Sequence, residues 1–533
     1  MWQWIRAGVA VWVAGLMACA CVQAAEPARP AASEIPRVDR EDAALRDVFF
    51  TSPRTGFAVG DRGTILRTDD GGQSWTLLPC ETDASLRSIS FVSEQEGWIA
   101  GGGTREYSGE TYGVVLVTQD GGESWTIACG QGIPTIRRIQ FFSDAEGIAV
   151  GDATSRLSTG LLSTADAGRT WAMIPGDEST GWTAGEFASL QFAVLVGERG
   201  AVGALSGGSV VKSTSLGGLR GFRASSLDRS AKSVWAVGDG GMIVRSNDGG
   251  ATWPAADGTL PPETKMVFDF SAVAALNNQV WVGGTPGSVI WHSPDAGVTW
   301  AAQPTGETTP LYAIRSLKNG RKVAVGALGK ILISDGDGPW TTVRGARRRL
   351  AALAVHAHGS RVSLLELGRD AQDRGYRVGS WSLVRRDVEP GTDRPAHGTR
   401  RLEDAVISLG GACGTTDWRL PVSLPGLDRN PQALMAEWSV LADQKLNDVL
   451  VATIATQIRT WRPDVLLLDD APADDTPTQV IHAALAVATG HARMDQGRMT
   501  PLWKTAGLPE WNVKRVYSRS LNGREGDLSI DPF

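Results

Sequence analysis

Arginines at matching positions in three successive repeats of this chain could together bind an anion. Arg46, Arg87 and Arg137 each follow an apolar residue that lies 15 positions before the glycine of its own repeat. Planar guanidinium groups form paired hydrogen bonds with carboxylates and phosphates. If the repeats converge on one mouth, these side chains and Arg138 predict a basic patch for a carboxylate, a phosphate or an acidic peptide. In the alternative interpretation, each arginine forms an ion pair with an acidic residue of the neighbouring repeat.

Two histidines in the second half of the chain are weak candidates for a metal site. His356 and His358 alternate along an extended segment, so both could point the same way and supply two ligands. Zinc takes about three protein ligands from nitrogen, sulfur or oxygen donors. A third ligand would have to come from His482 or from a nearby carboxylate. Because the two histidines alone supply fewer ligands than zinc takes, we expect no zinc and no other cofactor here. The carboxylates in question are Asp469, Asp470, Asp474 and Asp475.

A short apolar phrase that ends in glycine recurs along the first part of the chain and would position such residues. Successive glycines lie 41, 50, 46, 41, 46 and 42 positions apart. A period of about 40 to 50 residues built from short β-type runs is typical of β-propeller blades. The copies therefore predict an all-β, seven-bladed propeller whose inner strands line a common axis. They read Phe57-Ala-Val-Gly60, Trp98-Ile-Ala-Gly101, Ile148-Ala-Val-Gly151, Val194-Leu-Val-Gly197, Trp235-Ala-Val-Gly238, Trp281-Val-Gly-Gly284 and Val323-Ala-Val-Gly326.

A second phrase, Ser/Thr-x-Asp-x-Gly-x-x-Trp, follows the first in most repeats. Its Asp and Ser/Thr side chains can hydrogen-bond nearby backbone amides, and its glycine can adopt a positive φ, as a hairpin turn requires. This is the Asp-box found in sialidases and related propellers. Because the carboxylate is engaged in the turn, we interpret the copies as structural and not as active sites. The pairs are Asp70 and Trp75, Asp120 and Trp125, Asp166 and Trp171, Asp248 and Trp253, and Asp295 and Trp300.

Composition and the first residues indicate an exported protein, periplasmic or in the cell envelope. The chain has 533 residues and a formal net charge of −6, which gives no support to a nucleic-acid-binding role. An apolar run behind Arg6 is too short to span a membrane and predicts a signal peptide over residues 1–24. A rival interpretation makes residues 16–19 a lipobox, with a lipid anchor at Cys19. Residues 25–42 then form a flexible leader.

Two cysteines of the propeller occupy near-equivalent places in adjacent blades. Cys80 and Cys129 follow the Asp-box Trp of their blades by five and four residues. An exported protein can form disulfides, but similar positions do not guarantee the required Cα separation. The pairing of these cysteines therefore stays open.

The pattern changes at residue 345, so we place the propeller at residues 43–344 and a second domain at residues 345–533. There, strand-like runs alternate with helical periodicity, which predicts an α/β domain with a Rossmann-like, mostly parallel sheet. The chain ends abruptly at Phe533, so a truncated domain is an open alternative. The expected strands are 350–355, 376–384 and 464–468, and the expected helices are 363–374, 399–409, 433–461 and 477–490.

Three segments of the second domain, residues 400–410, 458–465 and 511–517, resemble the LmbE/PIG-L family of zinc-dependent N-acetylglucosaminyl deacetylases. In that family H-P-D-D-E follows the first strand, and a second metal motif reads H-P-D-H. Here the first place reads Val355-His356-Ala357-His358-Gly359 and the second reads Thr476-Pro477-Thr478-Gln479. The resemblance implies a deacetylase-like fold, and the lost ligands predict a degenerate pseudoenzyme.

The propeller resembles the exported seven-bladed family of photosystem II assembly and stability factors. The resemblance rests on phrases such as Gly60-Asp61-Arg62-Gly63 and Gly238-Asp239-Gly240-Gly241, which are interleaved with Asp-box turns. It implies a protein without catalytic residues that binds a protein partner, partly through an arginine-rich surface. A fused deacetylase-like domain is not part of that family's pattern.

The sequence therefore predicts a non-catalytic scaffold whose basic mouth engages an acidic protein partner, within a membrane-associated complex if the assembly-factor resemblance extends to function. The alternative is a hydrolase of N-acetylated sugars, either a metal-dependent deacetylase or a sialidase-like glycosidase in the propeller, with carbohydrate as the ligand. A sialidase needs a tyrosine nucleophile, converging arginines and a paired carboxylate. Of the five tyrosines in the chain, only Tyr312 is placed to reach the axis.

Overall fold

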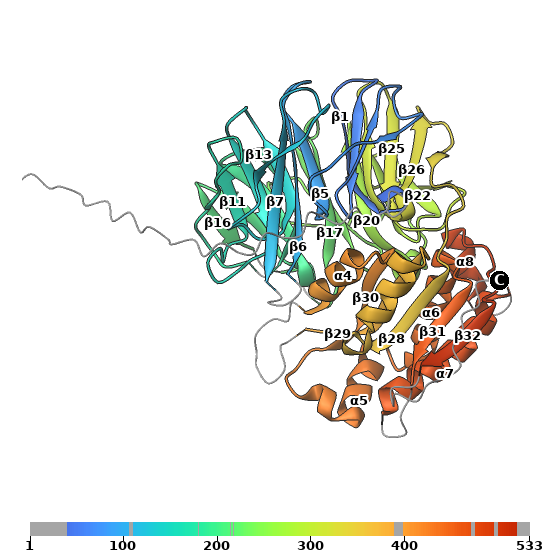
Figure 1. The fold of residues 1–533 in the computed structure, drawn as a ribbon. Coiled ribbons are helices and arrows are strands. Elements are labelled where there is room, and N and C mark those ends of the chain that lie inside the picture. The colour runs from blue at the N-terminus through green and yellow to red at the C-terminus, as the bar shows by residue number, and fades with distance from the viewer. Residues whose placement is uncertain are drawn as a thin grey trace, which may run out of the picture.

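We describe the protein from a computed structural model, which shows a propeller packed at one end against a smaller domain (Figure 1). The predicted signal peptide, most of the predicted leader, Cys19, Asp474 and the chain end at Phe533 lie outside the described residues. Those residues are 40–105, 110–179, 181–213, 215–216, 218–387, 398–470, 475–494 and 499–519.

Seven antiparallel sheets form the blades, which confirms the propeller and its blade number. Each blade is one continuous stretch of chain, and its first strand lies innermost. Blades 1 to 3 consist of β1 (Leu45–Phe50), β2 (Gly56–Gly60), β3 (Thr64–Thr68) and β4 (Thr76–Leu77); β5 (Ser85–Phe91), β6 (Gly97–Thr104), β7 (Thr111–Thr118) and β8 (Thr126–Cys129); and β9 (Ile136–Phe141), β10 (Gly147–Gly151), β11 (Leu161–Thr164) and β12 (Ala172–Met173).

The remaining blades continue the ring and close it. Leu45 and Val48 of blade 1 pack in one apolar cluster with Val323 and Val325 of blade 7, so the first and last blades are neighbours. Blades 4 to 7 consist of β13 (Trp182–Ser189), β14 (Phe192–Gly197), β15 (Val202–Ser206) and β16 (Ser209–Lys212); β17 (Phe222–Asp228), β18 (Ser233–Gly238) and β19 (Met242–Ser246); β20 (Asp269–Leu276), β21 (Gln279–Thr285), β22 (Val289–Ser293) and β23 (Ala301–Pro304); and β24 (Leu311–Ser316), β25 (Arg321–Gly326), β26 (Lys330–Asp335) and β27 (Thr341–Arg344).

The Asp-boxes form turns of the expected kind at the outer edge of the blades. In the first box, Thr68 Oγ1 donates to Asp70 Oδ1 at 2.8 Å, and the same oxygen accepts the backbone N–H of Ser74 at 3.0 Å. The indole of Trp75 donates to the carbonyl of Gly72 at 3.0 Å and so closes the turn. The other four boxes repeat the hydrogen bond from the Ser or Thr hydroxyl to the Asp carboxylate.

These turns predict an acid-sensitive contribution to stability. Hydrogen bonds from Ser124 lower the pKa of Asp120 to about 2, and those from Thr252 lower that of Asp248 to about 2. A carboxyl whose pKa is lower in the folded than in the unfolded state stabilises the fold above its unfolded pKa, and loses that effect as pH falls towards the folded value. We therefore expect the thermal midpoint to fall between about pH 4 and pH 2.

The measurement is the thermal midpoint as a function of pH for the wild type and for D120N/D248N. The double variant should show a shallower fall over this interval, because two of the titrating carboxyls are gone. Asp443→Asn, which alters an exposed carboxylate outside the motif, serves as the control and should follow the wild-type curve. Identical curves for all three proteins would contradict the prediction.

The second domain is a five-stranded parallel sheet with helices, as the sequence predicts. Its strand order β30-β29-β28-β31-β32 places the first strand of the domain in the centre, which is the order of doubly wound nucleotide-binding sheets. The strands are β28 (Ala352–His358), β29 (Val378–Arg386), β30 (Cys413–Val422), β31 (Val465–Asp469) and β32 (Arg515–Arg519).

The helices of this domain follow the expected segments closely, and the long one is broken as its length suggests. The sequence expectation did not include the edge strand β30 or helix α8. β30 contains Gly414, Asp417 and Pro421, which are uncommon in strands and hide its β character. The helices are α2 (Thr264–Val267) in the propeller and α3 (Leu364–Gly368), α4 (Gly398–Ser408), α5 (Pro431–Leu441), α6 (Leu446–Trp461), α7 (Thr476–Ala492) and α8 (Thr500–Ala506), with short turns η1 (Glu198–Gly200), η2 (Ala327–Gly329), η3 (Gly359–Arg361), η4 (Arg369–Asp373) and η5 (Leu427–Arg429).

The two domains share one hydrophobic core. A single cluster of buried side chains contains Phe268 and Leu328 of the propeller together with Leu353, Trp461 and Trp503 of the α/β domain. Polar contacts seal the same boundary, for example the bond from Thr308 Oγ1 to the carbonyl of Thr460 at 2.8 Å. The domains are therefore joined by a packed interface and not only by the chain that links them.

Two further expectations concern cysteines and membranes. Cys80 and Cys129 are both unpaired, so the structure holds no disulfide between them. Across the residues that the structure describes, no helix combines the length and apolar character needed to cross a bilayer.

Candidate functional site

The inner strand of every blade carries a β-bulge at the same place, and the bulged residues form a ring around one end of the axis. The register slips between Leu45 and Asp47 in blade 1, between Phe222 and Ala224 in blade 5, and at the corresponding place in the others. A bulge leaves one residue outside the ladder and re-aims its side chain. We call these residues the bulge ring: Arg46, Arg87, Arg137, Thr183, Arg223, Ser271 and Tyr312.

The ring brings Arg46, Arg87 and Arg137 together, as the sequence predicts, and adds Arg223. Along the sequence, Arg223 lies one residue further from the glycine of its repeat than the other three arginines do from theirs. In the structure it occupies the same bulge, because Phe222 pairs with Gly238 as Leu45 pairs with Gly60. One extra residue in the β17–β18 hairpin accounts for the apparent offset.

The arginines of the bulge ring are engaged in ion pairs. Arg46 holds Asp61 with two bonds, Nε to Oδ1 at 3.0 Å and Nη2 to Oδ2 at 2.6 Å. Arg137 Nε donates to Asp152 Oδ1 at 2.8 Å. Arg223 pairs in the same way with Asp239, the residue after the repeat glycine of its blade. The carboxylate thus belongs to the arginine's own blade, whereas the sequence alternative placed it in the neighbouring one.

Blade 2 breaks this pattern, and the α/β domain supplies the carboxylate instead. Its residue after the repeat glycine is Gly102, which has no side chain to offer. Arg87 Nη2 reaches Asp404 Oδ1 of helix α4 at 2.6 Å, and Thr104 Oγ1 donates to the other oxygen at 3.2 Å. Asp404 could not be predicted as this partner, because nothing in its local pattern relates it to the propeller.

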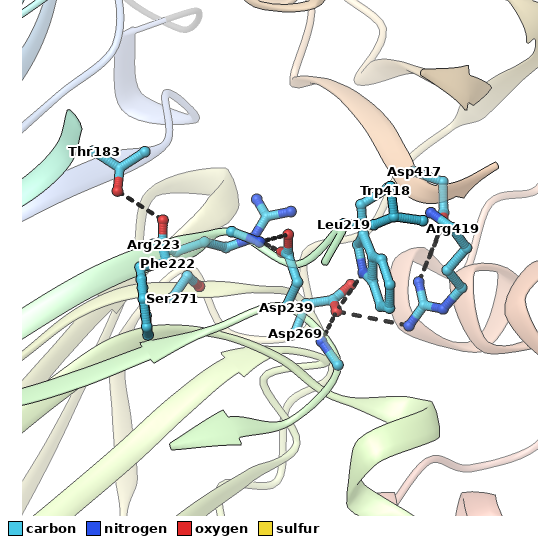
Figure 2. Close-up of polar contacts among 12 residues, drawn as sticks. Thr183, Leu219, Phe222, Arg223, Asp239, Asp269, Ser271, Asp417, Trp418 and Arg419 are labelled. Atoms are coloured by element: carbon cyan, nitrogen blue, oxygen red, sulfur yellow. Dashed lines mark hydrogen bonds and ion pairs between the residues drawn. The ribbon is translucent and has the colours of Figure 1, made fainter. Parts of the chain in front are cut away.

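The α/β domain covers this end of the axis, which we call the covered mouth. Figure 2 shows the contact on the side of Arg223, where strand β30 meets blade 6. The indole of Trp418 donates to Asp269 Oδ1 at 2.9 Å, and Arg419 lies 3.6 Å from the same oxygen while also binding Asp417 at 3.1 Å. Arg62 adds a bond to the carbonyl of Gly410 at 2.8 Å.

Electrostatics distinguish Arg87 from the other arginines of the covered mouth. Burial alone would lower the pKa of Arg46 and Arg137, but the carboxylates of Asp61 and Asp152 outweigh it and raise both pKa values above the ordinary range. For Arg87, burial and the nearby guanidinium groups outweigh Asp404, so its pKa is lowered. Burial is the largest cause of this lowering, so Arg87 is less fully compensated by its carboxylate than Arg46 and Arg137 are by theirs.

The other end of the same strands forms an open pocket of about 670 Å³, which we call the open mouth. Its lining comes from the far ends of β1, β5, β9 and β24 and includes the residues Phe49, Phe50, Phe91 and Phe141. Arg138, which the sequence grouped with Arg46, lines this pocket instead, because Arg137 is the bulged residue of its strand and Arg138 lies within the ladder. The other cations of the lining are Arg229, Arg315 and Lys318, which sequence reasoning missed because they do not share one repeat position.

A buried carboxylate binds two of the four cations of the open mouth. Asp47, whose side chain is 4% exposed, accepts from Arg315 Nη2 at 2.6 Å and from Arg138 Nη1 at 3.3 Å. The backbone N–H groups of Val48 and Ile89 also donate to it, at 2.9 and 3.3 Å. Its lone pairs are fully used, and the mouth as a whole carries more positive than negative side chains.

The weak metal candidates do not form a site within the described residues. The ring of His356 is only 7% exposed and its Nδ1 donates to Asp469 Oδ1 at 2.7 Å. His358 lies at the end of the same strand. No cluster of three or more His, Cys, Asp or Glu side chains suited to a metal occurs in the parts of the chain that the structure describes. The donor set present thus falls short of what zinc requires.

The candidate nucleophile of a sialidase is also poorly placed. Tyr312 lies in the bulge ring with the guanidinium of Arg46 stacked over its ring at 4.5 Å. Burial raises the pKa of its phenol above the ordinary value, which keeps the hydroxyl protonated.

Known proteins that are similar to this chain match its propeller. Photosystem II assembly lipoprotein Ycf48 of Synechococcus sp. (strain CC9902) is 51% identical over 59 residues, which are 10% of this chain and 17% of that protein. This chain therefore matches less than two thirds of that relative's length.

Solved structures resemble the propeller as well. One described as YCF48 bound to D1 peptide is 22% identical, with a TM-score of 0.44 over 56% of this chain and 93% of that one. YCF48 from Cyanidioschyzon merolae is 19% identical, with a TM-score of 0.44 over 55% and 96% of the two chains. The GH74 enzyme of Niastella koreensis is 13% identical, with a TM-score of 0.46 over 58% and 55%.

A family model also matches the chain in two segments of the propeller and the start of the second domain. Residues 32–172 and 224–369, together more than half of the sequence, match the family described as Photosynthesis system II assembly factor YCF48. The match includes the strands that carry the bulge ring in blades 1, 2, 3, 6 and 7. This chain belongs to the family of the photosystem II assembly factor YCF48.

Proposed function

We propose that this protein is an exported, non-catalytic scaffold that holds an acidic segment of a protein partner at the open mouth of its propeller. Membership of an assembly-factor family supports a protein complex as the object of its work. The single observation that carries the choice of site is the pocket of about 670 Å³, lined by aromatic rings and by four cations. The opposite, covered mouth has its arginines paired and lies against the α/β domain.

The chemistry of the open mouth suits a peptide better than an isolated ion. Phe49, Phe50 and Phe91, which are partly exposed, offer apolar and aromatic surface beside the charges. Arginine and aromatic side chains dominate protein-binding hot spots, and cations at the rim steer an acidic partner towards the mouth. Because Asp47 already neutralises part of Arg138 and Arg315, the exposed Arg229 and Lys318 are the cations most free to meet the partner.

Export and an envelope location form part of the same proposal. The signal peptide over residues 1–24 supports export, and the name of the Synechococcus relative, a lipoprotein, makes a lipid anchor at Cys19 the version to test first. In this proposal the α/β domain contributes no catalysis and serves as a structural cap on the propeller.

The test uses charge reversal at the rim of the open mouth. We expect R229E/K318E to weaken binding of a fluorescent, glutamate-rich peptide with an aromatic residue by about tenfold at low salt, because four units of charge change next to the ligand. Fluorescence anisotropy measures the affinity. Both side chains are exposed and support no described ion pair, so the fold should be retained.

Matched controls separate this site from general electrostatics. R169E/K212E makes the same change of net charge on the outer edge of blades 3 and 4 and should leave the affinity near that of the wild type. Alanine at Arg46, Arg87 and Arg137 tests the covered mouth, where we expect lower stability and unchanged peptide affinity. Wild-type binding by R229E/K318E, or a loss confined to the Arg46, Arg87 and Arg137 variants, would refute the open mouth as the binding site.

A further inference from the structure

The covered mouth contains a gap in a repeating chemical pattern. Three arginines of the bulge ring receive a carboxylate from the residue after the repeat glycine of their own blade. Blade 2 cannot do this, because Gly102 has a φ of +156° and a Cβ there would lie 2.1 Å from the carbonyl oxygen of Tyr112. The backbone thus excludes any side chain at this point, and among the described residues of blade 2 none provides a carboxylate to Arg87.

Asp404 fills that gap from another domain. Its side chain is 7% exposed and bonds to Arg87 at 2.6 Å and to the hydroxyl of Thr104 at 3.2 Å. Asp404 thus binds side chains of the first two strands of blade 2, as an acidic ligand would, although helix α4 of the same chain carries it. Charge-assisted bonds of this length are among the stronger hydrogen bonds in proteins.

The site still has unused donors. Arg87 Nε and Arg137 Nη2 are both buried and find no acceptor. Unpaired guanidinium nitrogens that are cut off from water favour any further oxygen that can reach them. Asp404 therefore leaves two guanidinium nitrogens of the covered mouth without an acceptor among the described residues.

We infer that the covered mouth is a carboxylate-binding site of the propeller that the chain fills with its own Asp404. This inference goes beyond the proposed function, because it concerns the opposite end of the axis and a ligand held in cis. It makes α4 a tethered ligand: an acidic group from outside can reach Arg87 only when Asp404 is absent or α4 is displaced. The α/β domain then excludes acidic partners from this end and leaves the open mouth to them.

Chemical rescue in the full-length protein tests this inference. Asp404→Ala should lower the thermal midpoint by about 5 °C, because it leaves Arg87 buried without a counter-charge. Sodium formate should restore at least half of that loss, in a saturable manner, relative to sodium chloride at equal ionic strength. Formate is the probe because it replaces the deleted carboxylate and fits the space that the side chain vacates.

Two variants establish that any rescue occurs at Arg87. Thr308→Val removes another interdomain hydrogen bond without creating an anion site, so formate should not restore its midpoint. R87M/D404A lacks the guanidinium and should not respond either. Equal stabilisation by formate of the wild type, Thr308→Val and Asp404→Ala would overturn the inference, as would rescue that persists in R87M/D404A.

A further variant decides the case in which Asp404→Ala does not fold. R87M/D404L replaces both charges by apolar groups. Replacing both members of a buried ion pair in this way often leaves the stability of the fold unchanged, whereas removing only one leaves an unpaired charge. A folded R87M/D404L protein supports the pairing of these two residues. Failure of this exchange to fold as well would overturn the inference.

Discussion

A chain cut after Arg344 is expected to lose most of its stability. Buried side chains at the end of the propeller, including Phe268 and Leu328, pack in the same cluster as Leu353 and Trp503 of the α/β domain. Exposing a large apolar side chain costs about 1.5–3 kcal/mol, so a few of them approach the whole stability of an ordinary domain. Removal of Asp404 would also leave Arg87 without its carboxylate.

Calorimetry measures this result. The full-length protein should unfold in one transition, and residues 40–344 alone should melt at least about 10 °C lower or precipitate. Residues 345–533 added in trans should raise the midpoint of the fragment, because they cover the same surface. A fragment that melts within a few degrees of the intact chain would show that the shared core contributes little.

Asp47→Ala is expected to separate stability from binding at the open mouth. The carboxylate is buried and serves Arg138, Arg315 and two backbone amides. Removing one side of a buried ion pair costs about 3–5 kcal/mol. The same change removes a negative charge beside the pocket, so the acidic peptide should bind about fivefold more tightly at low salt.

Urea unfolding and peptide anisotropy measure the two effects on one protein. Asp61→Asn is the matched control, since it removes a buried carboxylate at the covered mouth. This variant should lose stability without a gain in peptide affinity. Where Asp47→Ala is too unstable to purify, Asp47→Asn keeps the shape and still removes the charge. Weaker or unchanged peptide binding by the Asp47 variants would contradict the placement of the site.

The parts of the structure that depend on local pattern could be predicted from the sequence. Repeated glycine phrases fixed the blade number, and the matching positions of Arg46, Arg87 and Arg137 placed them in one ring. Their partners Asp61 and Asp152 also follow a spacing, 15 residues further along, that is visible in the sequence. Short-range order of this kind needs no knowledge of distant contacts.

The remaining features depend on how separate surfaces meet. Asp404 lies 317 residues from Arg87, and no periodicity links the two. Arg315 joins Arg138 only through the shared carboxylate of Asp47, which belongs to a third strand. That the α/β domain covers the mouth with Arg46, and leaves the one with Arg138 open, follows from three-dimensional packing that a single sequence does not encode in any local motif.

Because each inner strand carries its bulge at the same place, the residue presented at the axis does not depend on the length of the hairpin that follows. Leu45 and Gly60 pair across 15 residues in blade 1, whereas Phe222 and Gly238 pair across 16 in blade 5, yet both blades present an arginine at the same point. An extra residue in the hairpin between the first two strands of a blade therefore leaves the position of the arginine at the axis unchanged. The loops at the open mouth can therefore vary in length and acquire new recognition properties, while the arginines of the bulge ring keep their places.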